Sequence, residues 1–418
     1  MKNEQHVQGK RIAFILYNYP LLVSTMVVNS IALLSKENDV EVITVDRTID
    51  PATCDPWLQK MIVTPPACIY SSLPARLIIN IGYRLSRFVP DRFARIRWYL
   101  NQTGLVLFSF WLKRRCRSQA YDIIIPVECL SLIAVTSAGI RRGDVIYFNL
   151  ELLDWSKEPH PLYKNKSTLK ELEYEALKEV THVMITSPER ARIFCGINRF
   201  PDDRVSVLPV LPLHRESLPR SRYFRDRFSI PDHALLALYA GNFMPWAMCL
   251  EIIEGMNTWP EDTVLVMHTW NRTALSGDYF RKMQRAAEGH PVFFSSDLLC
   301  HQDLAPALSS GDIGLLFYES LDANFTEILF SSNKMAEYVD AGLPVICSAF
   351  PSLQGFVTEH GIGRSVDISD IGKALIQIRE DMEKYRRNVD RCRRLHFEFD
   401  PYFKTAFSEY LAHGVRGS

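Results

Sequence analysis

Short apolar runs rich in isoleucine and valine alternate along this chain with longer stretches that have helical spacing. Such alternation is typical of sheets of parallel strands joined by helices. Because the pattern occurs twice, we predict two α/β domains. The expected strands are residues 11–17, 40–45, 122–127, 145–150, 182–186 and 205–208 in the first half, and 235–240, 263–268, 292–294, 312–317 and 344–347 in the second.

A proline-bearing segment separates the two halves. Pro209, Pro212, Pro219 and Pro231 fall between residues 209 and 233, and proline disfavours both a continuous helix and a central strand. We place the crossing between domains here, with a first domain of residues 1–215 and a second of residues 216–395. A helical tail is expected from about residue 371 onward.

Composition excludes several classes of protein. The chain has 418 residues, with 48 Lys and Arg against 48 Asp and Glu, so no net charge gathers nucleic acid and we expect no nucleic-acid partner. The nine cysteines contain no C-x-x-C pair, which argues against a zinc site or a disulfide framework. The polar N-terminus lacks the apolar region of a signal peptide, and no apolar run approaches the roughly 18 residues of a spanning helix. We therefore expect a cytoplasmic protein.

One segment of the first half is unusually basic and aromatic. From Arg76 to Arg117 the single acid is Asp91, and aromatic and aliphatic residues are interleaved with the cations. Such a mixture suits the headgroup region of an anionic membrane, which predicts a peripheral membrane surface. The alternative is a solvated helix face that covers the first sheet. The basic residues are Arg76, Arg84, Arg87, Arg92, Arg95, Arg97, Lys113, Arg114, Arg115 and Arg117.

The segment from Ser331 to Ile346 carries the strongest functional signal. Serine and asparagine at its start are helix caps, and Gly342 followed by Pro344 ends the helix before a β-branched strand. The helix N-terminus would present free backbone N–H groups to an anion, and Lys334 adds a cation beside it. Glu337, one turn further on, can accept hydrogen bonds from two neighbouring hydroxyls such as those of a ribose. Phosphate and ribose together indicate a nucleotide.

These residues resemble the GT-B glycosyltransferases, especially the group 4 family, also known as group 1 glycosyl transferases. The C-terminal domain of that family carries P-S-K-x-x-E-Y-x-A-x-G-x-P-V-I, and the order and spacing are kept here. The resemblance extends in outline over the whole chain and suggests a divergent branch. The matching residues are Asn333, Lys334, Glu337, Tyr338, Ala341, Gly342, Pro344, Val345 and Ile346.

The resemblance implies a GT-B fold, with two Rossmann-like domains facing across a cleft. Residues 1–215 would bind the acceptor, residues 216–395 the nucleotide sugar, and the helix in residues 396–418 would return to the first domain. By the same analogy Glu337 holds the donor ribose. Lys334 and the hydroxyls and amides around it face the diphosphate, and the donor-binding candidates are Ser331, Ser332, Asn333, Lys334, Glu337, Gly241, Asn242 and His268.

Three departures from the family pattern stand out. The first acid of the family's E-x7-E pair is replaced by Leu329, which leaves recognition of the donor sugar open. The turn after the first strand of the second domain normally carries an arginine and a lysine, whereas residues 241–246 read G-N-F-M-P-W. The first strand of the chain is followed by Y-N-Y-P at residues 17–20 instead of a glycine-rich loop.

Acids at strand ends of the first domain are the candidates for catalysis. Glu128 follows the expected strand 122–127, and Glu151 and Asp154 follow the expected strand 145–150. Open α/β sheets bind ligands at these carboxyl ends, although caps and loop acids also occur there. An inverting transferase needs such a base for the acceptor hydroxyl. His268 ends another expected strand and either reaches the donor or is a structural histidine.

We therefore expect a glycosyltransferase that moves a sugar from a nucleotide-diphosphate donor to a hydroxyl acceptor. The resemblance implies no metal and no cofactor, since cations and a helix N-terminus take the metal's place. The acceptor is expected to be a glycan or a lipid-linked saccharide at the inner membrane face, on the strength of the basic segment alone. Two alternatives remain open: a sugar-nucleotide epimerase, and a non-catalytic partner subunit that keeps the fold.

Overall fold

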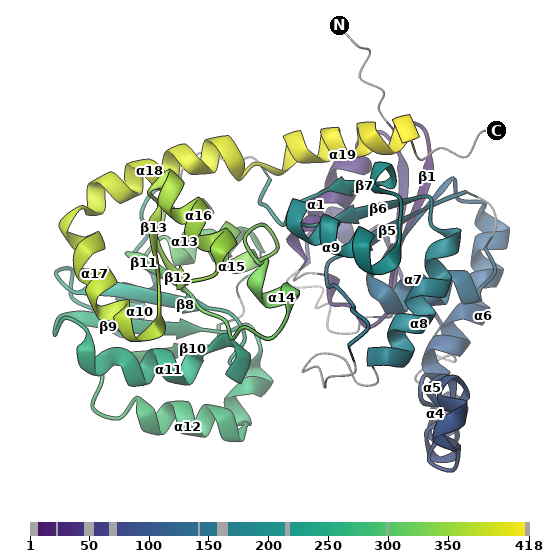
Figure 1. The fold of residues 1–418 in the computed structure, drawn as a ribbon, viewed down its shortest axis with the longest axis horizontal. Helices are drawn as coiled ribbons and strands as arrows, with labels where there is room; N and C mark the ends of the chain where they lie inside the picture. Colours follow the sequence, from purple (N-terminus) through teal and green to yellow (C-terminus); the bar gives the residue numbers. More distant parts are fainter. Residues whose placement is uncertain are drawn as a thin grey trace, which may run out of the picture. The chain divides into compact units, whose positions relative to one another are not determined.

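The structure is a computed structural model, and it describes residues 7–21, 24–45, 54–66, 73–140, 143–156, 166–213, 218–297, 299 and 301–413. The chain divides into two compact units (Figure 1). Unit 1 comprises Met1–Leu208 and Pro401–Ser418, and unit 2 comprises Pro209–Asp400. The division therefore falls at the first proline of the proline-bearing segment.

Unit 1 is built on a seven-stranded sheet whose strands are all parallel, in the order β3-β2-β1-β4-β5-β6-β7. The order reverses between β1 and β4, as in doubly wound nucleotide-binding folds. Its strands are β1 (Arg11–Leu16), β2 (Asp39–Thr44), β3 (Ile62–Val63), β4 (Ile123–Val127), β5 (Asp144–Asn149), β6 (His182–Ile185) and β7 (Val205–Val207).

The helices of unit 1 connect these strands, and one of them comes from the C-terminal end of the chain. In that helix, α19 (Phe399–His413), the Tyr410 hydroxyl donates a 2.7 Å hydrogen bond to Asp144 Oδ2. The Tyr410 ring also contacts the buried His182 ring, with 5.8 Å between centroids. The tail thus returns to the first sheet. The other helices are α1 (Thr25–Leu34), α2 (Pro56–Gln59), α4 (Leu73–Ser86), α5 (Ala94–Asn101), α6 (Thr103–Gln119), α7 (Glu128–Ser137), α8 (Lys166–Ala176) and α9 (Pro188–Asn198).

Unit 2 has a six-stranded parallel sheet in the order β10-β9-β8-β11-β12-β13, which reverses between β8 and β11. Its strands are β8 (Leu235–Ala240), β9 (Thr263–His268), β10 (Val292–Ser295), β11 (Ile313–Leu316), β12 (Val345–Ser348) and β13 (Gly363–Val366). Its helices are α10 (Tyr223–Phe228), α11 (Cys249–Glu254), α12 (Asp278–Ala286), α13 (His301–Leu308), α14 (Ala323–Thr326), α15 (Asn333–Asp340), α16 (Pro351–His360), α17 (Ile371–Glu380) and α18 (Met382–His396).

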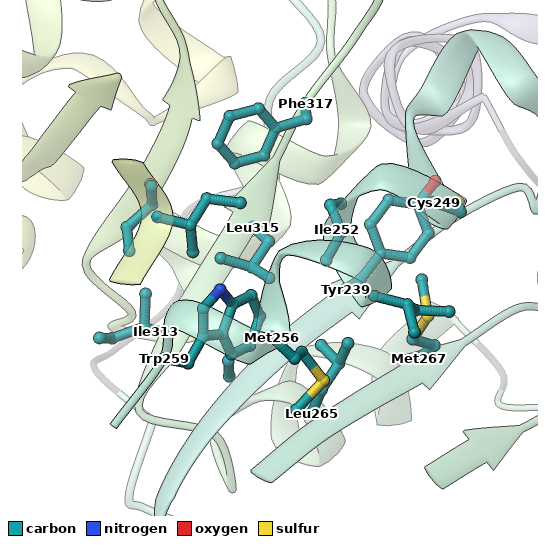
Figure 2. Close-up of a cluster of buried hydrophobic side chains, with 14 of the residues drawn as sticks. Tyr239, Cys249, Ile252, Met256, Trp259, Leu265, Met267, Ile313, Leu315 and Phe317 are labelled. Carbon is teal, nitrogen blue, oxygen red and sulfur yellow. The ribbon is translucent and has the colours of Figure 1, made fainter. Parts of the chain in front are cut away.

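A continuous hydrophobic core fastens the helices of unit 2 to its sheet. Figure 2 shows side chains of β8, β9 and β11, among them Leu265 and Leu315, packed against Ile252 and Met256 from the α11 region. The Tyr239 ring belongs to this cluster and is fully buried. Because β8 and β11 flank the point where the strand order reverses, this core holds rigid the edge at which a ligand would bind.

No helix in the described parts of the chain is both long enough and apolar enough to cross a bilayer.

Candidate functional site

The carboxyl ends of the strands near the two reversal points contain most of the candidate residues. In unit 2 the loop after β8 begins with Gly241, and α15 begins nearby with its motif residues. In unit 1 Glu128 follows β4 directly and Glu151 follows β5 closely. Open α/β sheets bind their ligands at such positions.

The beginning of α15 is shaped by Ser332. Its Oγ accepts a 3.4 Å hydrogen bond from the backbone N–H of Met335, which is the contact of an N-cap. The same Oγ shares a 3.1 Å hydrogen bond with the Tyr318 hydroxyl. The capped first turn places backbone N–H groups and the positive end of the helix dipole at this position, an arrangement that suits an anion.

Lys334, the second residue of α15, is buried between two tyrosines. Its Nζ donates a 3.0 Å hydrogen bond to the Tyr239 hydroxyl. Nζ also lies 4.5 Å from the centroid of the Tyr239 ring and 4.5 Å from that of Tyr318, a double cation–π contact. Within the described residues Lys334 forms no ion pair. Its charge is therefore not neutralised by a carboxylate, which favours binding of an anion.

Gly241 makes room for this lysine. A Cβ atom at residue 241 would lie 2.3 Å from Lys334 Cε, far inside van der Waals contact. The φ angle of Gly241 is 154°, a region that L residues rarely adopt. Its backbone N–H donates a 2.9 Å hydrogen bond to the His268 carbonyl, which ties the loop to β9. Glycine is thus required here both by conformation and by the lysine.

The turn after β8 contains an aromatic ring where the family carries cations. Trp246 stacks on Tyr318 with the two rings 5° from parallel and 6.2 Å between centroids. The carbonyl of Asn242 accepts a 2.7 Å hydrogen bond from the Tyr239 hydroxyl. The side-chain Oδ1 of Asn242 is buried and, within the described structure, has no hydrogen-bond partner.

The tyrosine of the motif is structural. The Tyr338 hydroxyl accepts a 2.8 Å hydrogen bond from the backbone N–H of Ala240 in β8 and donates a 3.1 Å bond to the Leu315 carbonyl in β11. Its ring lies against Gly314, where a Cβ would come within 2.5 Å of it. Tyr338 therefore links α15 to both strands at the reversal point and positions Lys334 and Glu337.

Glu337 lies one turn after Lys334 and is half-buried. Burial raises the pKa of Glu337 to about 7; Lys334 opposes the shift and Asp340 adds to it. Its carboxylate forms no hydrogen bond or ion pair with any other described residue. Both oxygens remain available to accept hydrogen bonds from a pair of ligand hydroxyls.

The other donor-binding candidates surround this centre. Ser331 and Asn333 are half-buried, and each already has an interaction within the chain. His268 is buried, with its Nδ1 3.0 Å from Ser295 Oγ. Burial lowers the pKa of His268 to about 4, so the ring is neutral at pH 7. Leu329 is buried.

In unit 1, Glu128 occupies an unusual backbone conformation. It lies at the junction of β4 and α7 with a φ angle of 66°, which non-glycine residues seldom adopt. Its Oε1 accepts hydrogen bonds of 2.8 Å and 3.0 Å from the backbone N–H groups of Leu150 and Glu151. Backbone strain of this kind costs about 1–3 kcal/mol and clusters at functional sites. This backbone conformation places the buried Glu128 side chain at the C-terminal ends of the strands.

The charge state of Glu128 is strongly perturbed. Burial raises its pKa to about 8 and the neighbouring Glu151 adds to the shift, while the two backbone hydrogen bonds oppose it. Burial also raises the pKa of Tyr19, and Glu128 contributes to that shift. Glu128 is therefore mostly protonated at pH 7, with a pKa close to that of an effective proton-transfer group.

Glu151 and Asp154 have different surroundings. Glu151 is half-buried, and its Oε2 lies 3.9 Å from the guanidinium of the buried Arg190. Asp154 forms a 2.5 Å ion pair with the buried Lys166. Although burial acts to raise the pKa of Asp154, its hydrogen bonds with Lys166 and Ser156 outweigh that effect and lower it. Glu151 thus influences the pKa of Glu128 through its charge, whereas Asp154 is held in an ion pair with Lys166.

A buried polar network supports the loop after β5. Lys170 pairs with Glu173 at 2.7 Å, and Glu173 accepts a 2.9 Å hydrogen bond from the Tyr147 hydroxyl. Asn149 Nδ2 donates to that hydroxyl at 3.0 Å and to the Glu151 carbonyl at 3.1 Å. Buried side chains that hydrogen-bond to one another rigidify their surroundings, although Asn149 Oδ1 has no partner in the described structure. The network therefore fixes the loop whose N–H groups hold Glu128.

Comparisons with known proteins bear on the fold of the chain. Residues 260–409 match the family described as glucosyltransferase 3-like, C-terminal domain, which is less than half of the chain. The fold is similar to sucrose-phosphate synthase from Thermosynechococcus elongatus, with a TM-score of 0.70, 15% identity, and coverage of 96% of this chain and 98% of that one. HepE from Anabaena, in complex with UDP-glucose, gives a TM-score of 0.66 at 11% identity, with coverage of 96% and 100%.

A third similar structure is the lipopolysaccharide outer core galactosyltransferase WaaB, with a TM-score of 0.56, 14% identity, and coverage of 96% and 99%. No curated protein matches the chain by sequence. The expected resemblance to GT-B glycosyltransferases is therefore confirmed, and the low identities fit a divergent branch.

Proposed function

We propose that this chain is a glycosyltransferase that moves a sugar from a nucleotide-diphosphate donor to a hydroxyl acceptor. The observation that carries the proposal is Lys334, a buried cation without a carboxylate partner at the start of α15, followed one turn later by the unpaired carboxylate of Glu337. A diphosphate satisfies the first group and a ribose the second. HepE, a protein of similar fold, is described in complex with UDP-glucose.

On this proposal the donor binds unit 2. Lys334 and the first-turn N–H groups near Ser331, Ser332 and Asn333 face the diphosphate. The ammonium and the helix N-terminus supply the positive charge that a metal ion would otherwise provide, so we propose transfer without a metal or cofactor. Asn242, whose backbone carbonyl accepts a hydrogen bond from the Tyr239 hydroxyl, is proposed to line the donor site together with Gly241.

Glu128 is our proposed base for the acceptor hydroxyl. A pKa of about 8 leaves a working fraction ionised near neutral pH and makes the ionised form a stronger base than an ordinary glutamate. Glu151 acts through its charge on Glu128, and Asp154 positions the loop through Lys166. The acceptor is proposed to be a glycan or lipid-linked saccharide, with the protein peripheral on the inner membrane face.

Thermal shift with a panel of UDP-, GDP-, TDP-, ADP- and CMP-linked sugars tests the donor. A ligand that binds only the folded chain at about 100 times its Kd stabilises it by about 2.7 kcal/mol. We expect one nucleotide class to raise the Tm of the wild type and of Glu359→Ala, an exposed control in unit 2. The same ligand should fail to raise the Tm of Glu337→Ala.

Two rival functions give different outcomes in the same experiment. Absence of any shift across the panel would favour a non-catalytic partner subunit, in which the substitutions at Leu329 and Asn242 have removed donor binding. Binding followed by conversion of one nucleotide sugar into its epimer, without any acceptor, would favour an epimerase. Release of the free nucleotide diphosphate only when an acceptor is present supports the transferase.

A further inference from the structure

Helix α4 has an apolar face that is exposed in the described part of unit 1. Its Leu77, Ile81 and Leu85 are spaced by four residues and so lie on one side of the helix, and Ile78 adjoins them. All four are exposed; Leu77, for example, is 59% exposed. Phe88, just beyond the end of α4, is 84% exposed. Single exposed apolar residues are ordinary, but a continuous stripe marks an interaction surface.

The opposite side of α4 explains why this face stays exposed. Ala75, Gly82 and Ser86 are buried. A Cβ at residue 82 would meet Thr103 Oγ1 at 2.1 Å, so glycine permits close packing of α4 on the neighbouring helices. Figure 1 shows α4 and α5 lying beyond the sheet-covering helices of unit 1. The helix pair is thus a projecting hairpin held at its inner side, whereas α6 of the same basic segment packs against α7 and buries Leu105, Phe108 and Leu112.

A third side of α4 is basic. Arg76 and Arg84 are exposed and, by helical spacing, border the apolar face. Arg87, which directly follows the last residue of α4, is also exposed. In the described structure none of the three forms an ion pair; Arg87 instead donates a 3.2 Å hydrogen bond to the Tyr83 hydroxyl. Arg92, at the tip of the hairpin, is also exposed.

Some basic residues of the segment 76–117 form ion pairs within unit 1. In α6, Arg115 pairs with Glu41 at 2.7 Å, and in α5, Arg95 pairs with Glu171 at 3.2 Å. These two cations serve the fold of unit 1. Most exposed aromatic and aliphatic side chains of the segment lie on α4 and in residues 88–96, among them Phe93 and Ile96, whereas α6 exposes Phe110.

We propose that the α4–α5 hairpin, residues 73–101, docks on an anionic lipid bilayer. Leu77, Ile81, Leu85 and Phe88 enter the boundary between headgroups and acyl chains, and the arginines beside them contact lipid phosphates. Charge complementarity favours this partner over a second copy of the chain, because two such basic hairpins would repel each other. The inference deepens the proposed membrane-linked acceptor, yet it needs no nucleotide.

Co-sedimentation of the full chain with vesicles tests the proposal. We expect binding to phosphatidylcholine vesicles that contain about 30% phosphatidylglycerol at low salt, and little binding to phosphatidylcholine alone. Binding should weaken at about 0.5 M salt, where charges are screened. Replacement of Arg76, Arg84 and Arg87 by Gln should lower the partition coefficient roughly a hundredfold, at about fivefold per arginine.

Matched variants separate this surface from general surface chemistry. Leu77→Gln with Ile81→Gln and Leu85→Gln should also lose binding, because the apolar contribution disappears. Arg364, Arg387 and Arg391 are exposed arginines of unit 2, and their joint replacement by Gln should leave binding unchanged, as should Leu395→Gln. Donor-induced stabilisation should persist in every variant, which shows that each folds and separates this test from failure of the donor site.

Two outcomes would overturn the proposal. One is a wild type that stays in the supernatant with anionic vesicles at low salt. The other is equal binding by the wild type and the α4 variants. If the wild type ignores vesicles but forms a dimer in light scattering that the Leu77, Ile81 and Leu85 replacements abolish, the face is an interface between two copies. If it does neither, the hairpin is left as a docking site for another protein.

Discussion

The two units share a strand order but differ in the ionisable side chains at the edge where each sheet reverses. In unit 1 the edge holds Glu128 and Glu151, whereas in unit 2 it holds Lys334. A buried charge without a counterion is costly, and the two units reduce that cost in different ways. Glu128 takes up a proton, with its pKa raised to about 8, and Lys334 lies against the faces of Tyr239 and Tyr318.

The helix dipole sharpens this contrast. Glu128 begins α7 and Lys334 is the second residue of α15. An acid at a helix N-terminus is favoured by the dipole, whereas a lysine there is disfavoured by about 0.3–1 kcal/mol. Lys334 is therefore the residue whose position most needs a ligand to explain it, and the strained φ angle of Glu128 is its counterpart in unit 1. On our proposal, the same strand order thus supports an anion-binding group in unit 2 and a proton-transfer group in unit 1.

The largest expected effect comes from Glu128→Gln, which removes the proposed base and keeps its shape. We expect kcat to fall about 10²–10⁴-fold while donor-induced stabilisation persists. Whereas kcat falls, the stability of the folded variant should rise relative to the wild type at high pH. Between the unfolded pKa near 4.5 and the folded pKa of about 8, the folded chain holds the proton longer, so rising pH destabilises wild type. Because Gln does not titrate, the free energy of unfolding of the variant should exceed that of the wild type by a few kcal/mol at pH 8.

Thermal melts of both chains from about pH 5 to pH 8 measure that difference. Glu128→Gly is a useful companion, because glycine adopts a φ of 66° without strain. A Glu128→Gln chain that transfers sugar at the wild-type rate would remove Glu128 from the reaction. The acids at the edge of the unit 1 sheet would then have only a structural role.

Much of the fold follows from the sequence. The predicted strands 235–240 and 263–268 have the bounds of β8 and β9, because both segments are fully buried and rich in apolar residues, as expected of strands inside a parallel sheet. β3 is two residues long and β13 reads Gly-Arg-Ser-Val, so neither has an apolar run and both escape prediction. Edge strands of this kind are defined by their neighbours more than by their own residues.

The site was only partly predictable. Lys334 and Glu337 follow from motif spacing within one helix. Tyr239 and Tyr318 do not, because each reads as a core residue beside its own strand, and only the fold brings both rings to the same ammonium. The strain at Glu128 is equally invisible in sequence, since nothing local marks a glutamate for positive φ.

The next effect concerns the cation. Lys334→Gln keeps a hydrogen-bonding side chain but removes the charge, and we expect donor affinity to fall about 10–100-fold because charge-assisted contacts to phosphate are lost. Isothermal titration with the nucleotide sugar identified in the panel measures it. Lys282→Gln, an exposed lysine of unit 2, is the control and should bind as wild type. Equal affinity in the two variants would mean that Lys334 is a purely structural cation.

Gly241→Ala should destabilise unit 2 and displace the lysine without touching its charge. The added Cβ meets Lys334 Cε, and φ is unfavourable for alanine, so a loss of about 2 kcal/mol is expected. Gly355→Ala is the matched control: it lies within α16 and a Cβ there meets nothing, so stability should rise by about 0.5–1 kcal/mol. Similar denaturation midpoints for Gly241→Ala and Gly355→Ala would show that the loop after β8 accommodates a Cβ atom at little cost.

The smallest expected effect is a pH dependence of donor binding. Because the pKa of Glu337 is about 7, its carboxylate is mostly neutral at about pH 6 and mostly ionised at about pH 8. The ionised form accepts stronger hydrogen bonds from ribose hydroxyls, so the Kd should fall several-fold as pH rises. Measuring the Kd against pH in the Glu128→Gln variant removes any contribution from the titration of Glu128. The Kd of Glu337→Gln should be independent of pH over the same range, and a persistent slope would assign the titration to another group.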